Sequence, residues 1–237
     1  MAKVYDAVVI GAGHNGLVTA SYLARAGLGV LVLERRDVVG GAAVTEEIFP
    51  GCKVDTGSHR IGGLHPALVT QLELKRHGLE LLRADPAVFA PALDGPHLML
   101  WRERATTARA ISEVSKSDAE AWGSFSALMT KAAGVLQAAW SMTPPNVTGS
   151  DPRDLWSIVK LGAKLRRLGK KDMVEVMRIL PMSVDELLGD WFESDLLKGT
   201  LAGSAVTGIF QGPMASGTAF TLLHRLVGAE ASVVRPT

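Results

Sequence analysis

The chain has 237 residues, of which 47% are hydrophobic and 21% charged, and its 25 basic and 24 acidic side chains leave a formal charge of +1. This is the balance of an ordinary globular protein, and the lack of a basic excess argues against a nucleic-acid-binding protein. The single cysteine, Cys52, excludes an intrachain disulfide and a CxxC redox pair, and it favours a reducing, cytoplasmic location.

The start of the chain predicts a strand, a helix and a second strand. Residues 5–10 (YDAVVI) are apolar and β-branched, as in a parallel strand that is buried on both faces, and they leave no room for a signal or transit peptide. Helical spacing follows over residues 15–26, and residues 30–33 (VLVL) predict a second buried strand that ends at Glu34. We therefore expect an α/β fold that begins with a Rossmann-like βαβ unit.

Three glycines, Gly11, Gly13 and Gly16, lie between the first strand and the helix. Gly11 permits the tight turn, Gly13 lets a pyrophosphate approach the backbone, and Gly16 lets the helix pack closely on the strand. The free N–H groups and the dipole at the helix start attract phosphates. Glu34 is placed to bind ribose hydroxyls and to repel a 2′-phosphate, which disfavours NADP. The alternative interpretation is an ordinary turn that binds no ligand.

The segment from Val9 to Glu47 resembles the carotenoid desaturase and amine oxidase superfamily of FAD oxidoreductases. Within that superfamily it is most similar to the phytoene dehydrogenase-like group, which includes the pyridine nucleotide-disulphide oxidoreductase domain-containing type 2 proteins. The likeness is carried by the motifs GAGHNGL, ERRDVVGGAAVTEE and LELKRHGL, and it continues weakly through WFESDLLKGTLAGSAVTG and QGPMASGTA. The resemblance implies FAD as the cofactor, bound by Gly11, Gly13, His14, Asn15, Gly16, Glu34, Arg35, Arg36, Gly40 and Gly41.

The same resemblance implies two segments close to the cofactor. The pair Gly40–Gly41 would let a loop run along the FAD, because only glycine allows such a close approach at little cost. Ala42 stands where many relatives have arginine, so the flavin contact of that arginine is not implied. Asp55, Gly57 and residues 58–60 resemble a segment that approaches the flavin. Within it, His59 has either a substrate-side role or an ordinary hydrogen bond in a loop.

The chain divides in this interpretation into a cofactor-binding unit, residues 1–64, and a mainly helical substrate or cap region, residues 65–237. That region begins with helical spacing through residues 65–77, and residues 88–93 and 97–101 then predict a hairpin. Helix-start signals follow at Ser117 with Glu120, at Asp151 with Pro152, and at Ser183 with Glu186. The uncharged stretch 199–223 contains five glycines and Pro213, which favours buried or cavity-lining chain over a membrane span.

Six basic residues fall within 12 positions beside leucines: Lys160, Lys164, Arg166, Arg167, Lys170 and Lys171. One interpretation is a solvated helix face. The other is a basic amphipathic patch that rests on anionic lipid and gives peripheral contact with a membrane.

Only two parallel strands are predicted, fewer than a doubly wound sheet contains, and no second nucleotide-binding unit follows residue 60. The parallel sheet is therefore expected to be incomplete, and a second polypeptide or self-association is expected to complete it. A truncated or processed product and a shortened fold that closes on itself are the alternatives.

The leading functional hypothesis is an FAD-dependent oxidoreductase that takes hydride from a lipophilic or amine substrate. No Ser-His-Asp set, HExxH motif or Cys/His metal spacing is present, so no metal site is predicted, and no catalytic residue is assigned. A non-catalytic nucleotide-binding subunit that needs a partner chain, and an NAD-dependent dehydrogenase, are the competing hypotheses.

Overall fold

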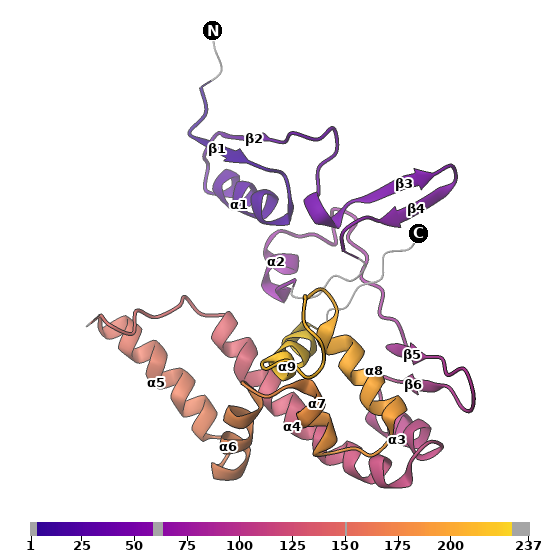
Figure 1. Cartoon of the computed structure of the whole chain (residues 1–237). Helices are drawn as coiled ribbons and strands as arrows, with labels where there is room; N and C mark the ends of the chain where they lie inside the picture. Colours follow the sequence, from indigo (N-terminus) through magenta and orange to yellow (C-terminus); the bar gives the residue numbers. More distant parts are fainter. Residues whose placement is uncertain (1–3, 59–63, 150, 229–237) are drawn as a thin grey trace. The chain divides into compact units, whose positions relative to one another are not determined.

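The computed structural model describes residues 4–58, 64–149 and 151–228, which fall into two compact units (Figure 1). The first unit ends at Arg83 and the second begins at Ala84, so the boundary expected after residue 64 falls inside the first unit. His59 and Arg60 lie outside the described residues, as do residues 229–237.

The first unit contains the βαβ arrangement that the sequence predicts. β1 (Ala7–Ile10) and β2 (Val30–Leu33) are parallel and paired from their first residues to their last. The helix α1 (His14–Arg25) connects them (Figure 1). The backbone N–H of Gly11 donates to the carbonyl of Leu33 at 2.7 Å, which extends the pairing into the turn.

The prediction that these strands are buried on both faces is wrong for the described chain. The side chains of Val8 and Ile10 alternate with those that face α1, and they are 55% and 87% exposed. Leu33, which pairs with Ile10 on the same face, is 48% exposed. One helix covers one face of a sheet, so the opposite face of this two-stranded sheet stays open among the described residues.

A short hairpin that the sequence analysis missed follows the βαβ unit. β3 (Thr45–Phe49) pairs antiparallel with β4 (Cys52–Asp55), and Gly51 in the turn has φ +78°. The helix α2 (Pro66–Gln71) comes next, and the side chain of His65 accepts a hydrogen bond from the N–H of Ala67 at its start.

The second unit is mainly helical, as expected, and opens with the predicted hairpin. The strands are shorter than the predicted ones: β5 (Val88–Ala90) pairs antiparallel with β6 (Leu98–Leu100). The helices follow in the order α3 (Arg104–Ser112), α4 (Lys116–Trp140), α5 (Pro152–Arg166), α6 (Lys170–Ile179), α7 (Val184–Gly189), α8 (Asp195–Val206) and α9 (Thr218–Gly228).

Most of the buried apolar side chains of the described chain belong to the second unit. Phe125 of α4 packs edge-on against Phe192, with ring centroids 4.9 Å apart. The core continues along α7, α8 and α9 through Leu187, Leu188, Leu197, Leu201, Ala205, Ala219, Leu222 and Leu223. The uncharged stretch 199–223 therefore buries one face of its helical parts, whereas Phe210 and Met214 in its loop are exposed. The first unit, by contrast, buries few apolar side chains.

Local capping signals were right at α5 and α7 and wrong at α4. Ser183 and Glu186 form the capping box of α7, and Asp151 caps α5. The helix α4 begins after Ser115, whose side chain accepts from the N–H of Asp118, so Ser117 is already helical. The capping box expected from Ser117 with Glu120 does not form.

Candidate dinucleotide-binding site

The turn between β1 and α1 requires glycine at its first and third glycine positions. Gly11 has φ +97°, a conformation that side chains strain. A Cβ on Gly16 would lie 2.0 Å from the carbonyl oxygen of Gly11, so the helix could not keep its present distance from the strand. These two glycines are thus explained by the fold alone.

Gly13 is different, because the described chain places no demand on it. Its φ of −74° and ψ of 176° suit any residue. A Cβ added there would meet only the Cα of Gly41 within 4 Å, at 3.8 Å, which is an ordinary van der Waals contact. The missing side chain leaves backbone open at the start of α1, where a ligand can come close.

The first turn of α1 presents its backbone N–H groups without a side-chain cap. Gly13 is the N-cap of α1, and no side chain of the described residues accepts a hydrogen bond from the N–H groups of its first turn. The N–H groups of the first helical residues have no acceptor within a helix, and the helix dipole adds partial positive charge there. The side chains of His14 and Asn15 are exposed at this turn. Such an arrangement is chemically suited to an anion such as a pyrophosphate.

The glycine pair lies against the glycine turn itself. The N–H of Gly40 donates to the carbonyl of Ala12 at 2.8 Å. A Cβ on Gly41 would lie 2.9 Å from the Cα of Gly13. Both residues of the pair have positive φ, at +125° and +60°. The structure therefore brings the two glycine segments together and explains the pair by backbone contact between them.

Glu34 is held over the turn by backbone amides. Its Oε2 accepts from the N–H of Ala12 at 2.8 Å, and its Oε1 accepts from the N–H groups of Arg35 and Arg36 at 2.9 and 3.0 Å. The hydrogen bonds from Arg36 and Ala12 lower the pKa of Glu34, and the bond from Arg35 adds to them. A carboxylate has about four acceptor positions. One position on Oε2 remains for a hydroxyl group of a ligand.

The two arginines after Glu34 differ in their engagement. Arg36 forms an ion pair with Glu46 of β3 at 2.7 Å, and the hydroxyl of Thr56 donates to the other oxygen of Glu46 at 3.1 Å. The hydrogen bond and the charge of Glu46 raise the pKa of Arg36. The hydrogen bonds from Arg36 and Thr56 and the charge of Arg36 lower the pKa of Glu46. Within the described chain, the side chain of Arg35 has no ion-pair partner.

The segment that the resemblance placed near the flavin is only partly described. The hydroxyl of Thr45 donates to the carboxylate of Asp55 across the β3–β4 hairpin. Gly57 passes so close to Ala42 that a Cβ would lie 3.0 Å from its carbonyl oxygen. This loop therefore continues the backbone packing that starts at the glycine pair.

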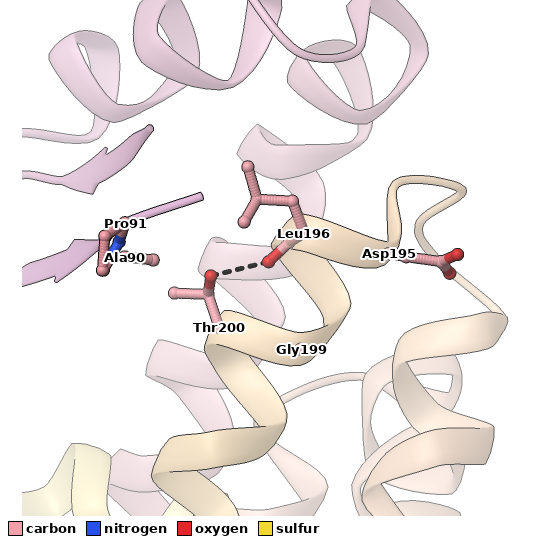
Figure 2. A pocket seen from close by; sticks show the side chains of 6 residues that line it. All are labelled: Ala90, Pro91, Asp195, Leu196, Gly199 and Thr200. Atoms are coloured by element: carbon pink, nitrogen blue, oxygen red, sulfur yellow. Dashed lines mark hydrogen bonds between the residues drawn. The ribbon is translucent and has the colours of Figure 1, made fainter. Parts of the chain in front are cut away.

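The second unit carries a separate shallow cavity of about 290 Å³. Figure 2 shows its lining, which consists of Ala90 at the end of β5, Pro91 after it, and Asp195, Leu196, Gly199 and Thr200 on α8. The hydroxyl of Thr200 donates to the carbonyl of Leu196 at 2.6 Å, and Asp195 pairs with Lys198 at 3.0 Å. Its polar groups are thus already engaged. Among the described residues, no cluster of His, Cys, Asp or Glu is suited to hold a metal ion.

The site therefore gathers the predicted glycines, Glu34 and Arg36 in one region of the first unit. Two partners were missed by the sequence analysis: the backbone N–H of Ala12 and the carboxylate of Glu46. The β-branched and aromatic residues of TEEIF, followed by Pro50–Gly51, were a hairpin signal that pointed to Glu46. No sequence signal identifies the N–H of Ala12, because that contact depends on the path of the backbone.

Comparison with known proteins agrees with this geometry. Residues 9–72 match the family described as the NAD(P)-binding Rossmann-like domain. The chain is 37% identical to pyridine nucleotide-disulfide oxidoreductase domain-containing protein 2 of Rattus norvegicus, over 95% of the chain and 41% of that protein. It is 42% identical to a limonene dehydrogenase subunit of Castellaniella defragrans, over 50% of the chain and 22% of that relative.

Solved structures support the fold. Cyclohexylamine oxidase from Brevibacterium oxydans has a TM-score of 0.51 and 20% identity, with 98% of this chain and 46% of the oxidase covered. The relatives that match nearly the whole chain are much longer than it, and the chain spans about two-fifths of their length. Residues 9–72 thus have a Rossmann-like fold that matches the NAD(P)-binding Rossmann-like domain family, and the chain is similar to part of the pyridine nucleotide-disulfide oxidoreductase domain-containing protein 2 sequences.

Proposed function

We propose that the chain binds FAD through the adenosine diphosphate half of the cofactor and forms part of an FAD-dependent oxidoreductase. The observation that carries this proposal is Gly13, a glycine that the fold does not need, located where α1 presents uncapped N–H groups. FAD is preferred over NAD because of the resemblance of the Val9–Glu47 segment to FAD oxidoreductases. The negative charge of Glu34 disfavours a 2′-phosphate.

Each part of the site has a role in this proposal. The N–H groups from Gly13 to Gly16 bind the pyrophosphate, and the side chains of His14 and Asn15 flank it. The remaining acceptor position of Glu34 receives a ribose hydroxyl. Arg36, which the resemblance places near the adenosine end, is held to β3 through Glu46, while Arg35 has no competing ion pair among the described residues. The pair Gly40–Gly41 keeps the second loop against the first.

When bound, FAD supplies the hydride acceptor. The chain's own part is to bind and orient the cofactor. The substrate in this proposal is a lipophilic molecule or an amine. No residue of the chain is assigned a catalytic role, because the described residues that form the site surround the adenosine diphosphate half.

We further propose that another polypeptide or a second copy of the chain covers the open face of the β1–β2 sheet. The exposed side chains of Val8, Ile10 and Leu33 form an apolar surface that a parallel sheet normally buries. The first unit buries only Ala12, Ala20 and Val44 among its described apolar side chains, too few for a core of its own. The single cysteine favours a reducing cytoplasmic location for the assembly.

The test is to measure binding of FAD, ADP and NAD to the purified full chain by equilibrium dialysis, together with identification of any nucleotide that copurifies. The proposal predicts that FAD binds, that ADP competes with it, and that extracted nucleotide is FAD. A protein that takes up neither FAD nor ADP contradicts the proposal. Extraction of NAD instead of FAD favours a dehydrogenase.

A non-catalytic nucleotide-binding subunit is the second candidate, favoured by the small core and open sheet of the first unit. The measurement that separates it from the enzyme is bleaching of the flavin absorbance by a substrate, with the chain alone and with its copurifying partners. Bound FAD that no substrate reduces in either preparation supports this second candidate.

A further inference from the structure

The helix α5 is attached to the second unit by one narrow face. Asp154, Ser157, Leu161 and Leu165 recur at helical spacing and are half-buried, and Leu165 packs on the main core. Neighbours of α5 are α4 and α6 (Figure 1). No residue of α5 is fully buried. Most of the helix surface therefore faces away from the protein.

The face of α5 opposite these contacts is apolar. Leu155, Trp156 and Val159 are 63%, 59% and 48% exposed, and Ile158 beside them is also exposed. At 100° per residue, Leu155, Val159, Gly162 and Ala163 follow one stripe on the side of the helix away from the packed face, and Arg166 ends this stripe. The exposed face of a solvated helix is usually polar, so the exposed apolar stripe favours the second of the two interpretations of this segment.

A basic edge runs beside the apolar stripe. Arg153, Lys160, Lys164 and Arg167 share this edge, and the ammonium group of Lys160 lies 5.5 Å from the ring centroid of Trp156. Residues 151–171 contain seven basic and two acidic side chains, in a chain whose formal charge is only +1. Within the described chain, none of the seven basic side chains forms an ion pair, and Asp151 is occupied in capping the helix.

We propose that the outer face of α5 binds an anionic lipid surface, with the apolar stripe inserted at the interface and the basic edge at the headgroups. Charge complementarity identifies this occupant: an apolar stripe with a tryptophan beside it and an unpaired basic edge is the arrangement of interfacial helices. A nucleic acid would use the basic edge and leave the apolar stripe exposed. None of the helices in the described parts of the chain has the length and hydropathy of a bilayer-spanning segment.

The experiment is cosedimentation of the full chain with phosphatidylcholine vesicles, with and without phosphatidylglycerol. The chain is expected to bind the anionic vesicles and to release them as salt is raised, since screening shortens the range of the attraction. Each basic residue near an anionic surface contributes about fivefold to partitioning, so replacing Lys160, Lys164 and Arg167 by Gln lowers it on the order of a hundredfold.

Two matched sets of variants separate the stripe from general charge. The double variant Trp156→Gln, Val159→Gln removes apolar surface without changing the charge, and it is expected to lower partitioning at least tenfold. Leu93→Gln with Val147→Gln changes two exposed apolar side chains elsewhere, and replacing Arg25, Lys75 and Arg83 by Gln removes the same charge elsewhere. Both control sets are expected to bind vesicles much as the unaltered chain does, and circular dichroism checks that every variant is folded.

Three results would overturn the proposal. The first is no binding to the anionic vesicles. The second is binding that the Trp156 and Val159 variant leaves unchanged, which assigns the basic edge to polyanions in general, including RNA. The third is loss of binding by the control sets to the same extent. Loss of FAD binding in any variant is measured separately and does not bear on α5.

Discussion

Replacing Gly13 by Ala isolates the ligand-dependent part of the glycine turn. The dihedral angles of Gly13 suit alanine, and the new methyl group would contact the Cα of Gly41 at 3.8 Å without a clash. The N-cap position loses about 0.5–1 kcal/mol with alanine, and the stiffer unfolded chain returns about 0.4–1 kcal/mol. The free energy of unfolding of the nucleotide-free chain should therefore change by less than about 1 kcal/mol.

Nucleotide binding should respond far more strongly. The methyl group projects where the pyrophosphate approaches, and losing one charge-assisted hydrogen bond costs about 1.5–3 kcal/mol, or about ten- to a hundredfold in Kd. Calorimetric titration with ADP and FAD gives the Kd, and thermal unfolding without nucleotide gives the stability.

Two controls bracket this result. Gly16→Ala forces a Cβ to within 2.0 Å of the Gly11 carbonyl oxygen, so it should destabilise the fold by about 1–3 kcal/mol or more. Gly123→Ala, in open space on α4, should leave the Kd unchanged. The reasoning is refuted if Gly13→Ala binds ADP with an unaltered Kd, or if it unfolds like Gly16→Ala.

Three further predictions address Glu34, the core of the second unit and the open sheet. Glu34→Gln should weaken ADP binding about tenfold. In the unaltered chain, the stabilisation from the lowered pKa of Glu34 is complete above its ordinary pKa of about 4.3 and is lost as the pH falls through the lower pKa of the folded state. The Kd for ADP should therefore stay constant as the pH is lowered to that range. Asp118 is buried, and its carboxylate accepts hydrogen bonds at 2.9 Å from the N–H groups of Glu193 and Ser194, which precede α8. Asp118→Ala should therefore lower the free energy of unfolding by about 2–4 kcal/mol in chemical denaturation. The control Glu120→Ala, at an exposed position on the same helix, should change it by less than about 0.5 kcal/mol. Changing Val8 and Ile10 together to Thr should reduce association in sedimentation velocity while leaving the monomer's circular dichroism unaltered; equal association of both proteins would argue against a covered sheet.

The parts of the structure that local chemistry determines were predictable. The βαβ order follows from two β-branched runs around a glycine turn, and the capping box of Ser183 with Glu186 forms as its spacing indicates. The capping box expected at Ser117 fails because α4 begins two residues earlier, with Ser115 as its N-cap. The carboxylate of Asp118 in that first turn binds backbone N–H groups 75 and 76 residues away. Such long-range contacts leave no local signal.

The same distinction holds within the candidate site. The sequence identified Glu34 and the glycines, and it assigned Gly11 to the turn, Gly16 to helix packing, and Gly13 and the pair Gly40–Gly41 to close approach of the cofactor. In the structure, backbone conformation and backbone contacts require glycine at Gly11, Gly16 and Gly41, whereas they place no such demand on Gly13. Burial on both faces of β1 was also expected from composition alone, and composition does not say which segment supplies the cover.

The most direct test of the proposed site is a titration of the ¹⁵N-labelled full chain with ADP, followed by amide resonances in NMR spectra. The largest shifts are expected on the backbone N–H groups from Gly13 to Gly16 and on the N–H of Ala12 beside Glu34. Saturable ADP binding that leaves these resonances in place and shifts others would contradict the proposed pyrophosphate site.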